Sequence, residues 1–289
     1  MNAPQLPPAI EALIRAALRE DLGETGDLTS EFFVPEEATC NARIFAKEPG
    51  VAAGLDVAEW VFRAIDDTLS LHVETRDGVP FEPGDTLLLV AGRTRSILTA
   101  ERTALNFLQR LCGVATQTRS YVDAVKPHAV QILDTRKTTP GWRWLEKRAV
   151  RSGGGHNHRM GLFDMVMVKD NHLLAEARQA ELQAAIDALK EQQPALRIEL
   201  EADTLGQVER FLSLRGVDVI LLDNMAPETL RQAVALNHGR VQLEASGGIT
   251  LATVAEVAAT GVHFISVGAL THSVRAVDLS LELSPQEPT

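Results

Sequence analysis

Residues 196–224 read LRIELEADTLGQVERFLSLRGVDVILLDN. Two short runs rich in Val, Ile and Leu flank a segment whose apolar residues recur at helical spacing, so the stretch predicts a strand, a helix and a second strand. Runs as apolar as these are typical of strands buried on both faces. A strand–helix–strand unit of this kind predicts parallel pairing through a right-handed crossover.

The same rhythm continues on both sides of this stretch. Further strands are predicted in AVQILDTR (129–136), FDMVMVKD (163–170), GRVQLEASGG (239–248) and HFISVGAL (263–270), and helices in 177–192, 204–216, 226–237 and 250–261. Nearly every strand run ends in polar or glycine residues, and a (β/α) barrel builds its active site from such C-terminal strand ends. We therefore predict a barrel, which is incomplete because only six or seven units fit. An open doubly wound sheet is the alternative.

The chain before residue 113 has a different pattern. A helix is predicted from Ala9 to Asp21, followed by short strands between Thr39 and Val90 with one helix at 55–65. A long helix then extends to Pro127, with Gly113 as a point where it would kink or break. We predict one α/β domain over residues 1–112 and a barrel domain over 113–274.

Composition limits the classes of partner. The 289 residues carry a net charge of −11 and only 4% aromatic residues, which disfavours a nucleic-acid binder. The N-terminal segment does not resemble a secretory signal, and no apolar run reaches the roughly 20 residues that a membrane span needs. Cys40 and Cys112 form no CxxC pair and are predicted to be buried thiols in a reducing compartment. We expect a cytoplasmic protein without a membrane partner.

Residues 134–159 reverse the charge of the acidic chain. This island contains two acids, Asp134 and Glu146, and seven cations: Arg136, Lys137, Arg143, Lys147, Arg148, Arg151 and Arg159. The four cations between 143 and 151 have helical spacing and are predicted to form a solvated helix face. Arg136 and Lys137 end a strand and Arg159 follows a glycine run, so these three predict anion binding, since Arg offers a planar fork and Lys a point charge.

Two glycine segments accompany these cations. Gly153–Gly155 indicates either a flexible surface loop or a backbone that approaches a ligand; His156 and His158 nearby lack a third ligand for a metal. The segment Ser246-Gly247-Gly248 ends a late strand before a predicted helix, so its backbone N–H groups predict a phosphate site, which Gly268 would complete. The alternative for the second segment is a tight turn.

Glu201 and Asp223 end neighbouring predicted strands. Their carboxylates suit Mg²⁺ or sugar hydroxyls, and the alternative is salt bridging to Lys137 or Lys169. Glu199 has the same strand parity as Glu201, so both point inward if either does.

The order of these motifs closely resembles the quinolinate phosphoribosyltransferases. The resemblance covers nearly the whole chain and is carried by EDLGETGDLTS, ERTALNFLQRLCGVAT, DTRKTTPGWR, GGGHNHRMGLFD, VMVKDNH, IELEAD, LLDN, EASGGIT and VGALTHS. It implies phosphoribosyl transfer from phosphoribosyl pyrophosphate to quinolinate, giving nicotinate mononucleotide, pyrophosphate and CO₂ in NAD biosynthesis. It also implies an N-terminal α/β sandwich domain, an incomplete barrel, packing of residues 275–289 back on the first domain, and a homodimer with active sites at the subunit interface.

The resemblance also implies a role for individual residues. Arg102 would reach quinolinate from the partner subunit, and Lys137, Lys169, Glu201 and Asp223 would be the catalytic set, with Glu201 and Asp223 at the ribose and Mg²⁺. The remaining substrate-binding residues would be Thr135, Arg136, His158, Arg159, Ser246, Gly247, Gly248, Val267, Gly268 and Ala269. Cys112 departs from the serine expected in many relatives.

Two other functions stay open at this point. An enzyme of the same fold that uses nicotinate would need fewer cations than a dicarboxylate does. A non-catalytic carrier of small anions would bind phosphate compounds without turnover, and the presence of both Glu201 and Asp223 counts against it.

Overall fold

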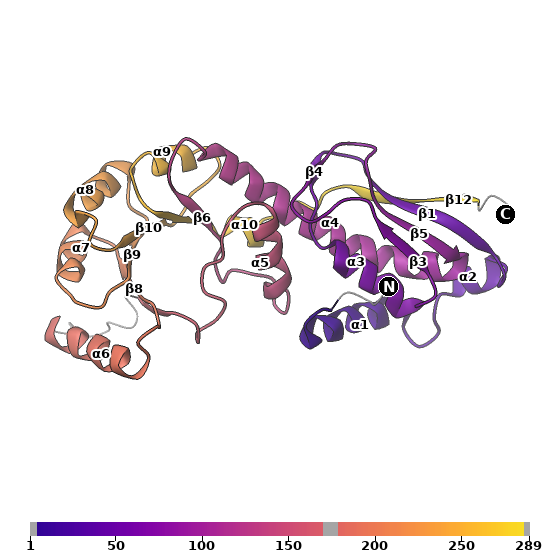
Figure 1. Ribbon diagram of the computed structural model, residues 1–289, viewed down its shortest axis with the longest axis horizontal. Coiled ribbons are helices and arrows are strands. Elements are labelled where there is room, and N and C mark those ends of the chain that lie inside the picture. Colours follow the sequence, from indigo (N-terminus) through magenta and orange to yellow (C-terminus); the bar gives the residue numbers. More distant parts are fainter. Residues whose placement is uncertain (1–4, 170–178, 286–289) are drawn as a thin grey trace. The chain divides into compact units, whose positions relative to one another are not determined.

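The computed structural model describes residues 5–169 and 179–285, and the chain divides into two compact units (Figure 1). Unit 1 consists of residues 1–117, 140–154 and 274–289, and unit 2 of residues 118–139 and 155–273. The segment 140–154 therefore belongs to unit 1, although it lies inside the range predicted for the barrel domain. Asp170 and Asn171, at the end of one predicted strand, lie outside the described residues.

Unit 1 is built on an antiparallel sheet of four strands in the order β12-β1-β5-β3. Its elements are α1 (Pro8–Leu22), α2 (Leu28–Phe33), β1 (Thr39–Ala46), β2 (Gly50–Val51), α3 (Leu55–Ile65), β3 (Ser70–Val73), β4 (Pro80–Phe81), β5 (Thr86–Arg93), α4 (Thr94–Ala124), α5 (Arg143–Ser152) and β12 (Leu279–Pro285). The helices predicted at 9–21 and 55–65 are confirmed. Strand β12, from the C-terminal segment, pairs along the whole of β1.

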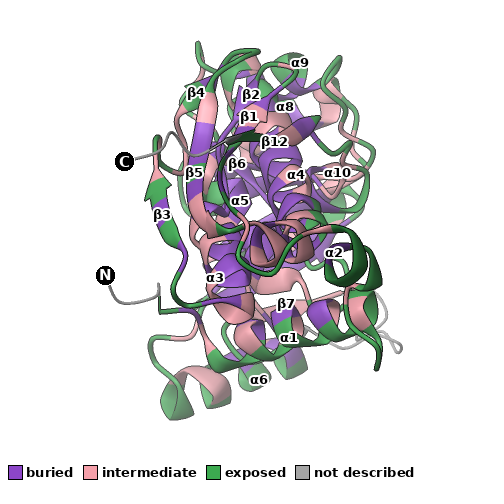
Figure 2. Cartoon of the chain, turned by 90° about the vertical axis from the view of Figure 1, so that its right-hand side faces the viewer, coloured by how far each residue is buried: buried purple, intermediate pink, exposed green. Residues whose placement is uncertain are grey.

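The sheet and its helices share one core. Residues along β1 alternate between exposed and buried, as expected for a strand packed on one face. Helix α3 buries Trp60, Val61 and Phe62, and burying a large apolar side chain contributes about 1.5–3 kcal/mol. Figure 2 shows buried residues along β5, α3 and α4. Both cysteines lie in this core, and burial raises the pKa of the Cys112 thiol to about 12, as expected for an inert thiol.

Helix α4 is continuous through Gly113, so the predicted break is wrong. The glycine serves a close approach instead. A Cβ at Gly113 would lie 2.3 Å from the carbonyl oxygen of Arg275 and 3.0 Å from a methyl group of Val274. The segment that leads into β12 passes directly over the helix at this residue, where any side chain would collide with backbone.

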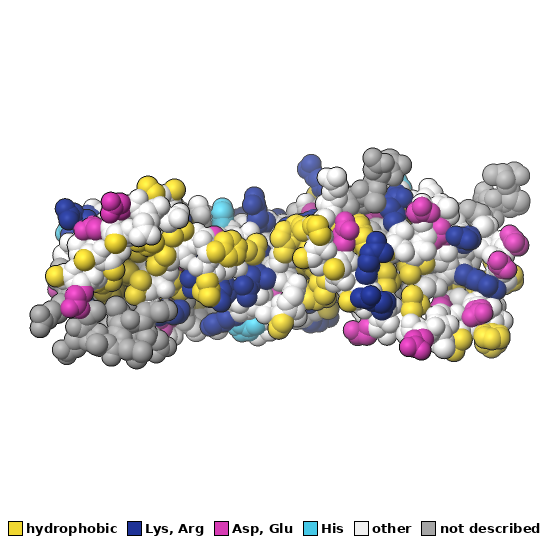
Figure 3. Space-filling view, turned by 90° about the horizontal axis from the view of Figure 1, so that it is seen from below, with side chains coloured by type: hydrophobic (Ala, Val, Ile, Leu, Met, Phe, Trp, Pro, Cys, Tyr) yellow, Lys and Arg dark blue, Asp and Glu magenta, His cyan; other side chains and the backbone are white. Residues whose placement is uncertain are grey.

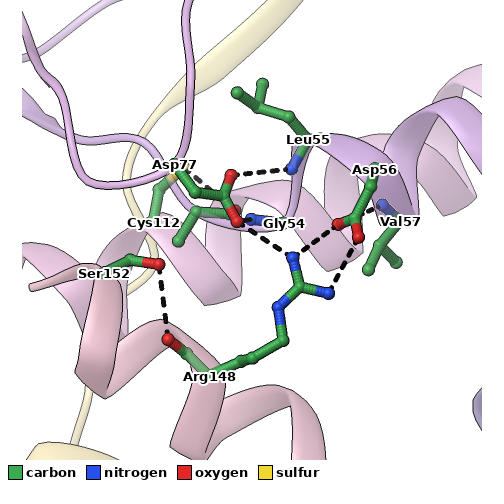
Figure 4. A network of polar contacts seen from close by, with 9 residues as sticks. Gly54, Leu55, Asp56, Val57, Asp77, Cys112, Arg148 and Ser152 are labelled. Carbon is green, nitrogen blue, oxygen red and sulfur yellow. Dashed lines mark hydrogen bonds and ion pairs between the residues drawn. The ribbon is translucent and has the colours of Figure 1, made fainter. Parts of the chain in front are cut away.

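Helix α5 is not the solvated helix that its cations predict. Lys147 is only 1% exposed, and Leu145, Ala149 and Val150 are buried beside it. Arg148 pairs with both oxygens of Asp56 at 2.8 and 2.9 Å and reaches Asp77 at 3.1 Å (Figure 4). The helix packs its middle turns against unit 1, which buries or pairs these cations; Arg151 alone of the four is fully exposed.

The same network fixes the start of helix α3. The carboxylate of Asp77 accepts hydrogen bonds from the backbone N–H groups of Gly54 and Leu55 at 3.0 and 3.2 Å. These are N-terminal amides that the helix itself leaves without acceptors. Arg148 therefore holds an acidic cap in place as well as joining two elements.

Unit 2 contains the parallel sheet. Its elements are β6 (Gln131–Leu133), β7 (Val166–Val168), α6 (Gln179–Gln192), β8 (Ile198–Ala202), α7 (Leu205–Leu212), β9 (Val219–Asp223), α8 (Pro227–Asn237), β10 (Gln242–Ser246), α9 (Val254–Ala258), β11 (Phe264–Ser266) and α10 (Ala269–His272). The six strands pair in the order β6-β11-β10-β9-β8-β7, all parallel. All six predicted strands are confirmed.

The sheet is curved but not closed. Strands β6 and β7 lie at its two ends in the pairing order and do not pair with each other, which agrees with the predicted incomplete barrel. Helices α7, α8 and α9 cover its outer side in Figure 1. Strand β8 is buried along its whole length, although it carries Glu199 and Glu201. Among the described residues, no helix is long and apolar enough to cross a membrane.

The replacement Gly113→Ala tests the close approach at helix α4. We expect it to lower the free energy of unfolding by about 1–3 kcal/mol, since the new methyl group overlaps backbone that cannot rotate away. Gly206→Ala is the matched control, because a Cβ there meets nothing within 4 Å and Ala is the better helix former. Urea unfolding checks both; a Gly113→Ala protein as stable as the control would contradict the packing described here.

Candidate active site

A buried carboxylate attaches the segment 156–159 to the end of strand β6. Asp134 is fully buried and accepts hydrogen bonds from Asn157 Nδ2 at 2.6 Å and from the backbone N–H of His158 at 2.9 Å. The N–H of His156 also donates to the carbonyl of Ile132, and His156 forms an isolated β-bridge with Leu133. In the glycine run before it, Gly153 and Gly155 are buried and Gly154 is exposed.

This attachment brings Arg159 near Arg136. The guanidinium of Arg159 donates to the carbonyl of Met165 at 3.2 Å and lies 3.6 Å from the sulfur of Met167. Within the described part of the chain, no carboxylate lies within ion-pair distance of it. Burial, and then the charge of Arg136, lower the pKa of Arg159. Arg159, beside a second cation, forms a site for an anion, and Arg recognises carboxylates in a planar fork.

Lys137 lies over Gly268, between the ends of strands β6 and β11. Its carbonyl accepts a hydrogen bond from Thr271 Oγ1 at 2.7 Å, and its N–H donates to Thr135 Oγ1 at 3.0 Å. A Cβ at Gly268 would lie 3.1 Å from Cδ of Lys137 and 3.0 Å from the ring of His272. The missing side chain of Gly268 thus leaves room for the lysine.

Lys169 and Glu201 form an ion pair of 2.5 Å across the ends of strands β7 and β8. Glu201 is 8% exposed, whereas the side chain of Lys169 is 42% exposed. The salt bridge that the sequence left open as an alternative is therefore present, and the lysine is the partner that solvent or a ligand can reach.

Strands β9 and β10 end in two tightly packed turns. Asn224 has a left-handed backbone (φ 51°), donates its N–H to the carbonyl of Ser246 at 2.8 Å, and contacts the Asp223 carboxylate at 2.6 Å. Gly247 has φ 94°, and a Cβ there would lie 2.1 Å from Oδ1 of Asn224. Only glycine fits this turn. Helix α9 begins later, at Val254, so the glycines do not open a helix directly.

Glu201 and Asp223 fit Mg²⁺ by their chemistry but do not form a complete cage. Their carboxylate oxygens are the hard ligands that Mg²⁺ prefers, and they end adjacent strands. Among the described residues, however, neither belongs to a group of three potential ligands, and Glu201 already contacts Lys169. The pair suits an ion that takes its other ligands from water and substrate phosphates, as Mg²⁺ commonly does.

A second polar cluster lies deeper in the barrel. Nε2 of His158 lies 3.1 Å from Glu199 and 3.5 Å from Glu244, and all three side chains are less than 10% exposed. Burial raises the pKa of Glu199 to about 7. Burial and the neighbouring Glu199 carboxylate raise the pKa of Glu244 to about 8. The two carboxyls come from strands β8 and β10, which flank β9, and alternate strands fill one layer of a barrel interior.

The predicted site residues fall into two groups. Arg102 lies exposed on α4, in unit 1. The others lie at or just beyond the C-terminal ends of the parallel strands of unit 2, and these are Thr135, Arg136, Lys137, His158, Arg159, Lys169, Glu201, Asp223, Ser246, Gly247, Gly248, Val267, Gly268 and Ala269. Figure 3 shows Lys and Arg side chains gathered with a histidine on one face.

Sequence reasoning did not assign roles to Asp134, Asn157 and Glu244. Asp134 was noted as a polar residue at a strand end and as an acid within a cationic island. Glu199 and Glu244 carried the stronger signal, because a carboxylate inside an apolar strand run is expensive to bury without a partner. Their position in the middle of IELEA and VQLEA marks them as interior acids.

Comparisons with known proteins agree over both units. Residues 27–112 match the N-terminal domain of quinolinate phosphoribosyl transferase, and residues 114–282 match its C-terminal domain. A probable nicotinate-nucleotide pyrophosphorylase [carboxylating] of Bacillus subtilis is 40% identical over 275 residues, covering 95% of this chain and 93% of the relative. A quinolinate phosphoribosyltransferase [decarboxylating] of Nicotiana tabacum is 40% identical over 300 residues, covering 97% and 85%.

A solved structure supports the same assignment. The nicotinate-nucleotide pyrophosphorylase of Francisella tularensis superposes with a TM-score of 0.90 and 35% identity, covering 98% of this chain and 99% of that one. Together with the fold, these relatives define an enzyme of the pentosyltransferase class. Within that class, the chain belongs to the quinolinate phosphoribosyltransferase family.

Glu244→Gln tests the buried carboxyl pair through pH. The raised pKa keeps Glu244 protonated in the folded state, while in the unfolded chain it ionises near its ordinary value of 4.5. The folded state then binds more protons, so this group's contribution to stability falls as pH rises from about 5 to about 8. Glutamine mimics the neutral acid and does not titrate.

We expect the free energy of unfolding of Glu244→Gln, minus that of the wild type, to increase by more than about 1 kcal/mol between pH 5 and pH 8. Urea unfolding at several pH values measures the difference. Parallel curves for the two proteins would show that Glu244 is ionised in the folded state.

Proposed function

We propose that this protein transfers phosphoribosyl from phosphoribosyl pyrophosphate to quinolinate and releases CO₂, giving nicotinate mononucleotide and pyrophosphate in de novo NAD biosynthesis. The observation that carries the proposal is the pair Arg136 and Arg159, two guanidinium groups near each other, with no ion-pair partner for Arg159 among the described residues. Quinolinate is a pyridine with two adjacent carboxylates, and two arginines match two carboxylates.

The first chemical step needs no strong base. The ring nitrogen of quinolinate already has a lone pair, which attacks C1 of the ribose while the bond from C1 to pyrophosphate breaks and its electrons leave with pyrophosphate. Negative charge grows on the leaving group, where Lys137 and Lys169 would stabilise it. Glu201 and Asp223 would hold the ribose hydroxyls. Their negative charges would also stabilise the positive charge that develops on the ribose ring.

We propose Mg²⁺ as the cofactor, held by Asp223 and Glu201 together with the substrate. When bound, the ion would neutralise charge on the pyrophosphate. The turn Ser246–Gly248, with Gly268 and its neighbours Val267 and Ala269, would hold the 5′-phosphate through backbone N–H groups, since the glycines keep this surface clear of side chains.

Decarboxylation follows from the first step. Once the ring nitrogen is quaternary, the bond from C2 to its carboxylate can break, and its electron pair remains on C2 beside the positive nitrogen. C2 then takes a proton from solvent and CO₂ leaves. The chain's contribution is to hold the second carboxylate, so that the ring stays oriented while the first is lost.

The proposal includes the assembly and the compartment. Arg102 would complete the quinolinate site of a partner subunit in a homodimer, and the protein would act in the cytoplasm on small anions. Plant proteins that are similar to this chain include ones named as chloroplastic and mitochondrial. The compartment is therefore tested separately, by locating a tagged chain in cells.

A single assay decides the function. Purified protein with quinolinate, phosphoribosyl pyrophosphate and Mg²⁺ should release CO₂ and form nicotinate mononucleotide. The same assay with nicotinate in place of quinolinate should give little product, because one carboxylate leaves one arginine unpaired. Preference for nicotinate, or no product from folded protein, would overturn the proposal.

Arg159→Met tests the arginine pair. We expect KM for quinolinate to rise about 100-fold while KM for phosphoribosyl pyrophosphate changes little, since loss of one member of a charged pair removes about 2–5 kcal/mol of binding. Arg231→Met is the control, because Arg231 lies on helix α8 and, within the described residues, forms its ion pair with the exposed Glu228. Equal effects on the two substrates would remove Arg159 from the quinolinate site.

Arg102 is tested by mixing two inactive chains. An Arg102→Ala chain and a Lys137→Ala chain, each inactive alone, should recover about a quarter of wild-type activity when dimers exchange, since half the dimers are mixed and each of these contains one intact site. Native mass spectrometry confirms the exchange. Mixed dimers without activity would show that Arg102 does not serve the partner's site.

A further inference from the structure

The cluster of His158, Glu199 and Glu244 is not used by the mechanism above, although it lies directly behind Arg159. Glu199 is 0% exposed and Glu244 is 2% exposed. Both oxygens of Glu199 and Oε1 of Glu244 lack a hydrogen-bond donor among the described residues. Buried carboxylate oxygens of this kind are unfavourable unless a neighbouring group compensates them.

The geometry admits two explanations. One atom from each of the three side chains lies within 4.8 Å of the others, which is close enough to hold a metal ion. Alternatively, the histidine itself carries the proton that the carboxylates need. The two explanations require different tautomers of His158, so the hydrogen bond at its other nitrogen decides between them.

That hydrogen bond comes from the backbone of Arg159. The N–H of Arg159 donates to Nδ1 of His158 at 2.7 Å. Nδ1 is therefore an acceptor without a proton, and Nε2 carries the ring proton. A protonated Nε2 has no lone pair for a metal ion, and it faces Glu199 at 3.1 Å and Glu244 at 3.5 Å. The structure favours a proton between ring and carboxylates over a metal.

We propose that Glu199 and Glu244 are positioning residues, which act through His158 to hold Arg159 in the orientation that binds a substrate carboxylate. The acids flank Nε2 of the ring at 3.1 and 3.5 Å, and Nδ1 of the ring accepts the backbone N–H of Arg159. On the other side of the histidine, Asp134 accepts the N–H of His158 itself. Residues 158 and 159 are thus held by buried carboxylates from three strands, β8, β10 and the end of β6.

The side chain of His158 is 7% exposed, and both ring nitrogens face protein atoms. The proposal adds a positioning part to the quinolinate contact that the family resemblance implies for His158. This inference rests on the proposed function, because it takes Arg159 as a quinolinate-binding residue.

Substitutions at two buried residues, Glu199 and His158, separate positioning from simple packing. Glu199→Gln keeps an oxygen that can accept the Nε2 proton, so its KM for quinolinate should stay within about threefold of wild type, whereas Glu199→Leu, of similar size, should raise it about 10–100-fold. KM for phosphoribosyl pyrophosphate should move little in either. If Glu199→Leu does not fold, the comparison moves to His158. The Asn oxygen of His158→Asn can still accept the N–H of Arg159, so this variant should retain more quinolinate affinity than His158→Leu. Glu228→Leu, at an exposed position of helix α8, is the control.

A double-mutant cycle gives the decisive readout. In an Arg159→Met background, Glu199→Leu should no longer raise KM for quinolinate, since there is no guanidinium left to orient. If Glu199→Leu does not fold, His158→Leu takes its place in the cycle. If the increase in KM of the double variant equals the product of the increases of the two single variants, the proposal is overturned. One equivalent of metal in the purified wild type that is lost in the leucine variant would also overturn it. Absence of quinolinate turnover in the wild type would instead refute the proposed function, and the two failures are therefore distinct.

Discussion

The site depends on one buried carboxylate, that of Asp134. Its hydrogen bonds to Asn157 and to the backbone of His158 attach an irregular segment to the residue that follows parallel strand β6. Without that attachment Arg159 would be a surface arginine some two dozen residues away along the chain. With it, cations from two separate parts of the sequence come together, and the like charges raise the free energy of the empty site. The protein tolerates this repulsion because the free energy of folding comes from the packed barrel and not from the charged site.

The charges near the strand ends lie at two depths. Arg136, Lys137 and Lys169 are accessible at least in part, whereas Glu199 and Glu244 are buried behind them. The charge of Glu199 lowers the electrostatic cost of holding Arg159 beside Arg136. The interior acids cannot replace a ligand, because no carboxylate reaches ion-pair distance of Arg159 in the described residues. The result is a positive surface in a chain of net charge −11, which concentrates attraction for anions in one place.

The sequence was sufficient for the order of elements, because parallel strands buried on both faces leave an unmistakable pattern and strand ends necessarily meet. It was insufficient wherever a partner distant in sequence decides the outcome. Gly113 looked like a helix breaker, but its absent side chain makes room for the backbone of Arg275. Arg148 looked like a surface residue, but it finds Asp56 and Asp77. His158 could be placed near the anion site from its motif; only the contact of Arg159 with Nδ1 shows which way the ring faces.

The pair of Lys169 and Glu201 links the two halves of the proposed site. The lysine is proposed to meet the leaving group and the carboxylate to meet the ribose, yet here they neutralise each other. A salt bridge with one exposed partner is worth little in water, so a phosphate that brings more negative charge than one carboxylate can compete for the lysine. The carboxylate, which is buried, cannot follow the lysine into solvent. Losing its partner therefore leaves Glu201 in need of a new one, and the incoming sugar hydroxyls and cation are the groups that arrive with the same substrate.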